Sequence, residues 1–319
     1  MKNERRYNRL GERYGARVFW TVLAIIFLVL ISVGLIWVFN AHGRRLTVVV
    51  AVEPTSIATF DFTSHKLIIL SFPSSAQISG VHGVGQYSLA SLWRLGLLAP
   101  GDPSLLADSL KQIAALPVEK YLGTKNRPNY TDGVDSLHLI FSVNNLANFM
   151  DGRYITNLSF GDFLTLSWQM WSLRPEEITT LTANNQSALY LEKQPDGSIV
   201  SVVDPNKLDA LIGENFADDN LRKESLRVAV YNTTQTPDLG SRVETLLKHA
   251  GILVVLVGNA SPATGRCSVE GAKEVLTSLT AKFIAAAYDC LLVEADNGGR
   301  ADLVVRVGRD FEKLFLPED

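Results

Sequence analysis

The feature that most constrains this chain is an uninterrupted apolar run near its start. Residues Val18–Phe39 contain no charge, no proline and one glycine. As a helix, 22 residues extend about 33 Å, which is enough to cross a hydrocarbon core of about 30 Å. Trp20 and Trp37 stand near the two ends, where indole rings favour the membrane interface. The run therefore predicts a transmembrane helix over residues 18–39.

A cleaved signal peptide is the alternative interpretation of this run. The apolar core of a signal peptide is about 7–15 residues long and is followed by small residues at the cleavage site. The run in this chain is longer, and it ends in the bulky residues Trp37 and Phe39. The sequence therefore favours an uncleaved anchor.

The charge distribution predicts the orientation of that anchor. Residues 1–17 carry six basic and two acidic side chains, whereas the rest of the chain is acidic and brings the net charge of the protein to −3. Only Arg44 and Arg45 follow the apolar run closely, so the positive-inside rule places the basic tail 1–17 in the cytoplasm. We expect a single-pass plasma-membrane protein with residues 40–319 outside the cytoplasm. The acidic outer part gives no support for nucleic acid as a partner.

The outer part is predicted to be α/β and to contain two domains. Residues 46–215 are expected to form the larger, three-layer-like domain, and residues 226–311 a small two-layer sandwich, with 216–225 as a charged linker. In the larger domain, the β-branched runs Leu46–Val52 and Lys66–Phe72 predict buried strands. Helices are expected over Tyr87–Leu95, from Pro103 to Leu116, near 137–143, after Ser159 and after Asp204-Pro205, and a turn between two strands at 195–197.

The C-terminal segment alternates strands and helices with short connections. The predicted order is β-α-β-β-α-β-β. The strands are expected at Leu226–Tyr231, Ile252–Val257, Arg266–Val269, Cys290–Glu294 and Asp302–Val307, and the helices from Thr236 to Ala250 and over Ala272–Tyr288.

No motif in the sequence identifies a catalytic residue, a metal site or a resident cofactor. The five histidines are scattered, and none of them forms a pair with metal-ligand spacing. The glycine-rich run 80–85 lacks the Lys-Ser/Thr of a phosphate-binding P-loop, and a loop turn is the simpler interpretation. No nucleophile motif such as Gly-x-Ser-x-Gly occurs.

The two cysteines, Cys267 and Cys290, stand at the starts of two predicted strands that flank one helix. Outside the cytoplasm disulfides persist, and closing a loop of this length contributes about 3 kcal/mol in the chain-entropy model. The sequence favours a disulfide, and two buried thiols are the alternative. A catalytic redox pair is disfavoured because the spacing is not Cys-x-x-Cys.

The C-terminal segment resembles a known family. Val228–Asn232, Gly240, Ala250-Gly251, Val254–Val257 and the closing Gly308-Arg309-Asp310-Phe311 are similar to the C-terminal domain of bacterial LytR–CpsA–Psr envelope proteins. The resemblance covers residues 226–311. It implies an accessory domain that is either ligand-free or binds a partner, and the family supplies no established catalytic residue there.

Residues 46–215 resemble a diverged catalytic domain of the same family. Lys66–Phe72 with Pro73 is similar to the strand that leads into the family's Ile-Pro-Arg-Asp loop. The resemblance implies transfer of a glycopolymer from a polyprenyl-pyrophosphate carrier to peptidoglycan. Arginines and an acidic residue would handle the pyrophosphate, usually with a magnesium ion.

The chain departs from the family at the position that matters for this chemistry. Where the family has Arg-Asp, the sequence reads Ser74-Ser75. Phosphoryl transfer depends on positioning and on stabilising the charge of the leaving group, and losing one preorganised donor costs about 100- to 1000-fold in rate. We therefore expect a non-catalytic membrane protein of the cell envelope that binds a cell-wall glycopolymer, a polyprenyl lipid or another envelope protein.

Two alternatives remain open at this point. The first is an active phosphotransferase that draws its cations from other positions; Arg94, Arg127 and Arg153 are then the candidate pyrophosphate contacts, with Lys120 and Lys125 as further sources of charge. Magnesium would be expected only in this case. The second alternative is a structural spacer or scaffold.

Overall fold

The computed structural model describes residues 45–312, apart from residues 82, 99–100, 214, 263 and 297, together with Trp20, Val22 and Ser32. The predicted tail 1–17 and almost all of the apolar run 18–39 lie outside the described residues. Among the described residues, no helix is long and apolar enough to span a bilayer. The transmembrane helix therefore stays a prediction.

A six-stranded sheet forms the centre of the larger domain. Its neighbours pair antiparallel from β1 to β2 and from β2 to β3, and parallel from β1 to β6 and from β3 to β8. The strand order is β7 (Ile155–Thr156), β6 (Lys120–Gly123), β1 (Arg45–Ala51), β2 (Thr55–Asp61), β3 (Lys66–Phe72) and β8 (Ile178–Thr182). The predicted strands at β1 and β3 are present.

The strand β2 was not expected from the sequence, because Pro54 was taken to end a strand and polar residues follow it. All seven residues of β2 are nevertheless buried. The hydroxyl of Thr59 bonds that of Thr47 at 3.0 Å, and the hydroxyl of Ser56 bonds that of Ser71 at 3.0 Å. These cross-strand pairs satisfy the hydroxyls and allow a polar strand to lie in the middle of the sheet.

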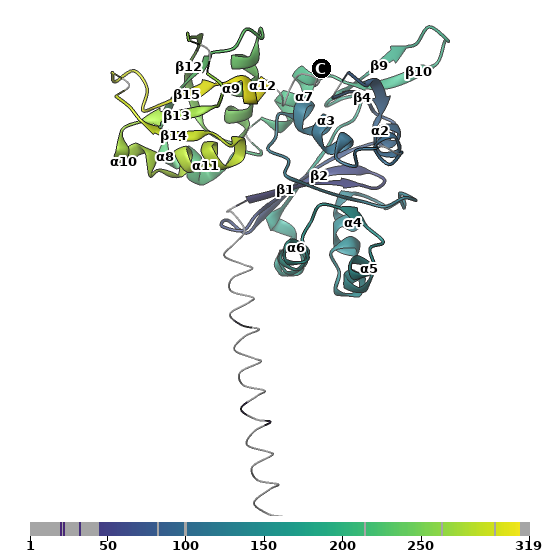
Figure 1. Cartoon of the computed structure of the whole chain (residues 1–319). Coiled ribbons are helices and arrows are strands. Elements are labelled where there is room, and N and C mark those ends of the chain that lie inside the picture. Colours follow the sequence, from purple (N-terminus) through teal and green to yellow (C-terminus); the bar gives the residue numbers. More distant parts are fainter. Residues whose placement is uncertain are drawn as a thin grey trace, which may run out of the picture.

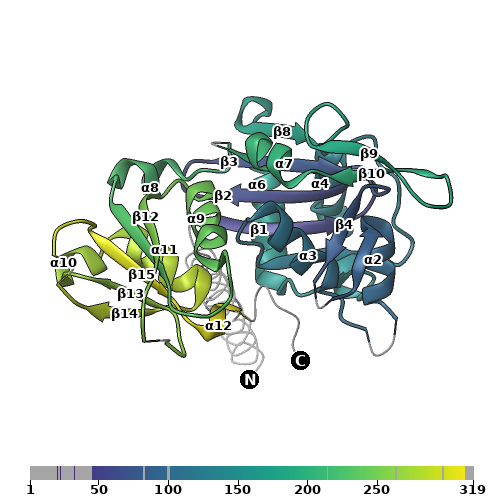
Figure 2. The ribbon, with the colours of Figure 1, turned by 90° about the horizontal axis from the view of Figure 1, so that it is seen from above.

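Helices cover both faces of this sheet, so the larger domain has three layers (Figures 1 and 2). On one face Val49, Ile57 and Leu70 form part of a core that includes residues from helices on that side. Those helices are α2 (Leu89–Gly96), α3 (Leu105–Ala114) and α7 (Pro205–Ile212). On the other face Val50 and Phe60 belong to a second core. The helices of that layer are α4 (Gly133–Ile140), α5 (Leu146–Met150) and α6 (Phe160–Ser172).

Local signals place several of these helices. Ser159 and Asp162 form a reciprocal capping box at the start of α6, with backbone-to-side-chain distances of 3.1 and 2.8 Å. Asp204 caps α7, whose first residue is Pro205. The sequence had suggested a weaker cap at Ser159, since Asp is not the preferred partner, but its carboxylate reaches the Ser159 amide.

A smaller, four-stranded sheet lies on the α2–α3 side of the domain. Its order is β5 (Gly85–Ser88), β4 (Gln77–Gly80), β10 (Ile199–Val203) and β9 (Leu189–Lys193). The glycine-rich run therefore turns between β4 and β5, and residues 195–197 turn between β9 and β10, as expected. Two 3-10 helices, η1 (Val143–Asn145) and η2 (Pro175–Glu177), complete this domain.

The C-terminal domain is a two-layer sandwich with the predicted order of elements. Its sheet runs β12 (Leu253–Asn259), β11 (Arg227–Asn232), β15 (Leu303–Val307), β13 (Ser268–Gly271) and β14 (Leu291–Glu294). Helices α9 (Leu239–His249) and α11 (Leu279–Tyr288) pack on one face of this sheet. The short helices α10 (Lys273–Leu276) and α12 (Arg309–Glu312) complete the domain. The sulfur atoms of Cys267 and Cys290 are joined in a disulfide within the core.

Two expectations for this region need correction. The single helix over 272–288 is divided into α10 and α11, because the Ser278 hydroxyl caps the amide of Ala281 and starts a new helix. The expected linker 216–225 contains helix α8 (Asp219–Glu224). Leu221 of α8 is buried in the C-terminal core, and the Glu224 carboxylate accepts hydrogen bonds from the backbone amides of Leu279 and Thr280 at the start of α11.

Candidate functional site

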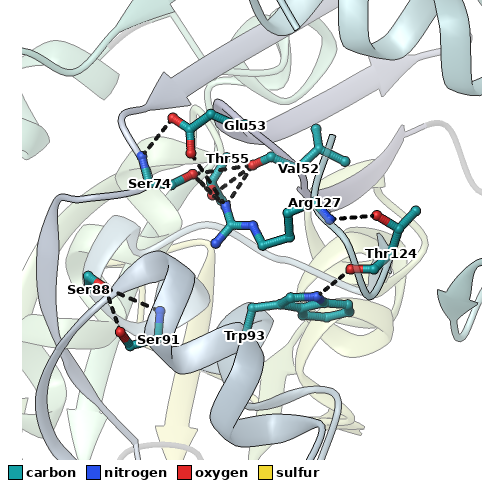
Figure 3. Close-up of polar contacts among 9 residues, drawn as sticks. All are labelled: Val52, Glu53, Thr55, Ser74, Ser88, Ser91, Trp93, Thr124 and Arg127. Atoms are coloured by element: carbon teal, nitrogen blue, oxygen red, sulfur yellow. Dashed lines mark hydrogen bonds and ion pairs between the residues drawn. The ribbon is translucent and has the colours of Figure 1, made fainter. Parts of the chain in front are cut away.

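The loop after β6 brings a single arginine into the interior of the larger domain. Arg127 has a positive φ of 43°, and its backbone amide bonds the hydroxyl of Thr124 at 3.1 Å. The indole of Trp93 on α2 donates to the carbonyl of Thr124 at 3.0 Å. Downstream, the amide of Tyr130 bonds the carbonyl of Glu53 at 2.8 Å. The loop is therefore fixed to α2 and to the end of β1, and the Arg127 side chain lies between them (Figure 3).

One terminal nitrogen of Arg127, Nη2, faces several oxygens. It lies 2.7 Å from the carbonyl oxygen of Val52 and 2.7 Å from the Thr55 hydroxyl, and it also bonds the Ser74 hydroxyl. The Glu53 carboxylate is 4.0 Å away, and its other oxygen accepts from the Ser74 amide at 3.2 Å. These contacts fix the guanidinium at the loop where the family resemblance expects Arg-Asp and this chain has Ser74-Ser75.

The other two nitrogens of this guanidinium are different. Only 7% of the Arg127 side chain is exposed, and Nε and Nη1 are buried with no hydrogen-bond partner among the described residues. Burial lowers the pKa of Arg127, the Glu53 carboxylate opposes this shift, and the nearby Arg94 charge lowers the pKa further. A buried cation with donors left over is costly unless an acceptor approaches it.

A cleft of about 680 Å³ lies beside this network, at the edge where β1, β3 and β8 end. Glu53 and Ser75 form part of its wall, next to Asp132 at the start of α4. The other polar groups of the lining are amides, hydroxyls and a phenol: Ser71, Asn129, Tyr130, Thr131, Thr180, Thr182, Asn184, Asn185 and Ser201. Among the described residues the lining contains no Lys or Arg. Burial raises the pKa of Tyr130, so its hydroxyl stays a neutral donor at ordinary pH.

The structure separates the three arginines proposed from the sequence. Arg127 lies at Ser74, and Arg94 of α2 is close enough to affect its pKa. Arg153 is an exposed residue that pairs with Asp151 at 3.8 Å. Of the two lysines, Lys120 pairs with Asp162 at 3.4 Å, and Lys125 is exposed. The fold therefore brings together two of these five cations, next to the cleft rather than in its lining.

Sequence reasoning did not identify Glu53 or Asp132 as residues of this site. Glu53 follows a buried strand directly, and Asp132 precedes α4 as its N-cap. Polar residues at the ends of strands are a signal for a site, and this signal was available in the sequence. Within the described residues, no group of three or more His, Cys, Asp and Glu side chains is arranged to hold a metal ion.

Residues 225–311 match the family model "LytR cell envelope-related transcriptional attenuator". This range is the C-terminal sandwich together with the end of the segment that precedes it. The match confirms the resemblance noted from Val228–Asn232 and the residues that follow. No curated protein matches the chain significantly.

Several solved structures are similar to this chain at low identity. TagV of B. subtilis has 10% identity and a TM-score of 0.40, over 66% of this chain and 99% of TagV. TagT bound to LI-WTA has 14% identity and a TM-score of 0.39, over 53% of this chain and 88% of TagT. A transcriptional regulator from Enterococcus faecalis has 11% identity and a TM-score of 0.39, over 66% of this chain and 89% of the regulator. At such TM-scores the likeness carries no argument about this chain.

The family assignment therefore rests on the sequence match and on the sandwich that the structure shows over the same residues. The sequence match places residues 225–311 in one family, and the structure shows that these residues form a sandwich with its own core. Residues 225–311 are a LytR C-terminal domain of the kind found in cell-envelope proteins.

Proposed function

We propose that this chain is a single-pass cell-envelope protein whose outer part binds an uncharged glycan segment of a cell-wall polymer without transferring it. The anchor is the apolar run 18–39, with the tail 1–17 in the cytoplasm and the domains outside. The LytR C-terminal domain supports a role at the envelope. The binding site is the cleft between Glu53 and Asp132.

The chemistry of the cleft lining is the observation that carries this proposal. Asn129, Asn184 and Asn185 offer amide groups, which donate and accept hydrogen bonds as sugar hydroxyls do. Tyr130 adds an aromatic ring with a neutral hydroxyl. The two carboxylates of the lining, on Glu53 and Asp132, accept hydrogen bonds from hydroxyls but repel phosphates. A neutral, hydroxyl-rich ligand therefore fits this surface better than a pyrophosphate.

The state of Arg127 supports binding over transfer. Its Nη2 atom is already occupied by Val52, Thr55 and Ser74. A catalytic donor must be aimed at the place where charge develops on the leaving group. In this structure Nη2 of Arg127 instead holds the loop at Ser74 in position.

Binding is tested with the full chain in detergent micelles and purified, phosphate-free glycan strands of peptidoglycan, by calorimetry. Asn129→Ala and Asn185→Ala should each weaken binding about tenfold, because each removes hydrogen bonds worth about 1.4 kcal/mol. Asn206→Ala, at an exposed position on α7, is the matched control and should bind like the wild type. Equal affinity in all four proteins, or no binding, would overturn the assignment of the cleft.

A phosphotransferase is the second candidate function, and one observation favours it. Nε and Nη1 of Arg127 are buried without a hydrogen-bond partner among the described residues, close to the charge of Arg94. If magnesium took part, Glu53 and Asp132 would be the carboxylates available in the cleft, since magnesium in phosphate chemistry is typically held by one or two carboxylates and the substrate. Transfer would then need the pyrophosphate to reach these nitrogens.

This alternative is tested by incubating the full chain with magnesium, a polyprenyl-pyrophosphate-linked glycan and peptidoglycan as the acceptor. Release of polyprenyl phosphate above background, with the phosphoglycan joined to peptidoglycan, would support the transferase and contradict binding alone. In that case Arg127→Met should abolish turnover, while the exposed Arg153→Met should leave it unchanged. A protein that neither binds glycan nor turns over this substrate would leave the scaffold role.

A further inference from the structure

Helix α6 has two apolar faces, and one of them is buried in the core. Phe163, Leu166 and Met170 are buried in the core beneath the six-stranded sheet. A second stripe consists of Phe160, Leu164, Trp168 and Trp171. At 100° per residue these four side chains fall within an arc of about 80° on the helix surface. The helix therefore presents a second hydrophobic side away from the core.

Three of the four residues of this second stripe are exposed, and Leu164 is half-buried. The exposed fractions are 45% for Phe160, 57% for Trp168 and 75% for Trp171. The two indole rings lie against each other, with centroids 5.4 Å apart. Scattered apolar residues are ordinary on protein surfaces, but adjacent large aromatic side chains at such exposure indicate an interaction surface.

Neighbouring helices of the same layer also expose large apolar side chains. Leu139 of α4 is 52% exposed and Met150 of α5 is 68% exposed. Figure 1 shows α4, α5 and α6 together on one side of the sheet, opposite α2, α3 and α7. The exposed apolar side chains of α4, α5 and α6 therefore belong to one layer of the domain.

The position of α6 relative to the start of β1 indicates what covers this stripe. Arg45 begins β1 and pairs with Asp61 of β2. The Asp61 carbonyl accepts a hydrogen bond from the side-chain amide of Gln169, which lies between Trp168 and Met170 on α6. The C-terminal half of α6 therefore packs beside the point at which the chain enters the outer domain.

The chain length before Arg45 brings this point close to the membrane. Five residues, 40–44, separate the predicted transmembrane run from β1. Even fully extended, five residues cover at most about 18 Å. With the anchor in the bilayer, the C-terminal half of α6, which carries Trp168 and Trp171, would lie near the membrane surface.

We propose that the exposed stripe of α6, centred on Trp168 and Trp171, docks onto the outer leaflet at the boundary between headgroups and acyl chains. Indole rings favour this boundary because one part of the ring is apolar and the N–H needs a polar partner. The acidic outer part gives no electrostatic attraction to anionic lipids, so a zwitterionic surface is the expected partner. This docking rests on the proposed membrane anchor and would hold the glycan cleft at a fixed height above the bilayer.

The test uses the tryptophans of the full chain. In the variant Trp20→Phe/Trp37→Phe, the remaining indoles are Trp93, Trp168 and Trp171. Trp93 is 1% exposed and serves as the internal reference. The protein is reconstituted in phosphatidylcholine vesicles with and without lipids brominated near the headgroup end of the acyl chain. We expect the brominated lipids to quench most of the tryptophan fluorescence of this variant. After Trp168→Ser and Trp171→Ser are added, the same lipids should quench little of the fluorescence that remains.

Flotation of the same vesicles separates the two proposals. Protein that floats with the vesicles but shows no quenching would overturn the docking and leave the anchor standing. Protein that fails to float would overturn the anchor and, with it, the docking. Cross-linking between two chains through α6, in place of quenching, would assign the stripe to a second copy and also overturn the proposal.

Discussion

The Nε2 atom of His249 lies 2.6 Å from Oδ1 of Asp209, which joins the last residue of α9 in the C-terminal domain to α7 of the larger domain. The other ring nitrogen, Nδ1, is 3.1 Å from the carbonyl oxygen of Ala115, at the end of α3. The His249 ring is buried, whereas the Asp209 side chain is 55% exposed, so this pair lies at the edge of the interface. The two domains are therefore connected by the polar contacts of a buried histidine and not only by the chain.

Replacing this histidine should loosen the domain interface. His249→Ala removes both contacts across the interface and leaves the carbonyl of the half-buried Ala115 without this partner, which costs about 1 kcal/mol in the free energy of unfolding. The loss is measured by urea unfolding of the full chain in detergent. Lys248→Ala is the matched control, because its pair with Glu244 is exposed and should cost no more than about 0.5 kcal/mol. Equal stability of both variants would show that the His249 contacts contribute nothing.

The disulfide should stabilise the C-terminal domain. Cys267 and Cys290 are separated by 23 positions. Without the disulfide the unfolded chain regains the entropy of this loop, which lowers the free energy of unfolding by about 3 kcal/mol in the chain-entropy model. The double variant Cys267→Ala/Cys290→Ala should therefore melt at a lower temperature, and reducing agent should lower the melting temperature of the wild type only. Titration of two free thiols in the unreduced, unfolded wild type would contradict the disulfide.

Tyr288 should make the C-terminal domain sensitive to alkali. It is fully buried, burial raises its pKa, and its hydroxyl has no hydrogen-bond partner among the described residues. Because the pKa is raised in the folded state, the stabilising contribution is present below the unfolded value of about 10 and is lost as the pH rises above it. Unfolding free energies measured from pH 8 to pH 11 should therefore fall at the alkaline end.

The variant Tyr288→Phe tests this relationship in two ways. It removes an unsatisfied buried hydroxyl, so the change in stability at pH 8 should lie between zero and about 1 kcal/mol in favour of the variant. The variant should also show a smaller fall in the free energy of unfolding between pH 8 and pH 11. Tyr190→Phe, at a position that is 41% exposed, should leave the decline in place. A decline that persists in Tyr288→Phe would assign the sensitivity to another group.

Several elements could be predicted from the sequence because their signals are local. The β-branched run Lys66–Phe72 is β3 with the expected bounds, and the order of elements after residue 226 was also predicted correctly. These predictions depend on side chains a few positions apart, and such neighbours interact whatever the rest of the chain does. The break between α10 and α11 was missed, although Ser278 is itself a local capping signal.

Other features depend on partners that are distant in the sequence. β2 is buried because its hydroxyls meet those of β1 and β3, and no pattern within Thr55–Asp61 indicates this. The stretch 216–225 reads as a charged linker, yet the Glu224 carboxylate caps α11, 55 positions away. The sequence shows that residues 216–225 are charged. It does not show that one of these charged side chains accepts hydrogen bonds from backbone amides of a distant helix.

The sequence by itself determined an apolar run long enough to cross a bilayer, the charge asymmetry around it, and the LytR C-terminal domain, since these depend on composition and local order. Only the tertiary structure decided that Arg127 meets Ser74, 53 positions earlier, and that Arg153 stays on the surface. It also decided that Trp168 and Trp171 face away from the core. Contacts between distant positions follow from how sheets and helices pack, so residue types alone did not reveal which arginine is buried or which face of α6 is exposed.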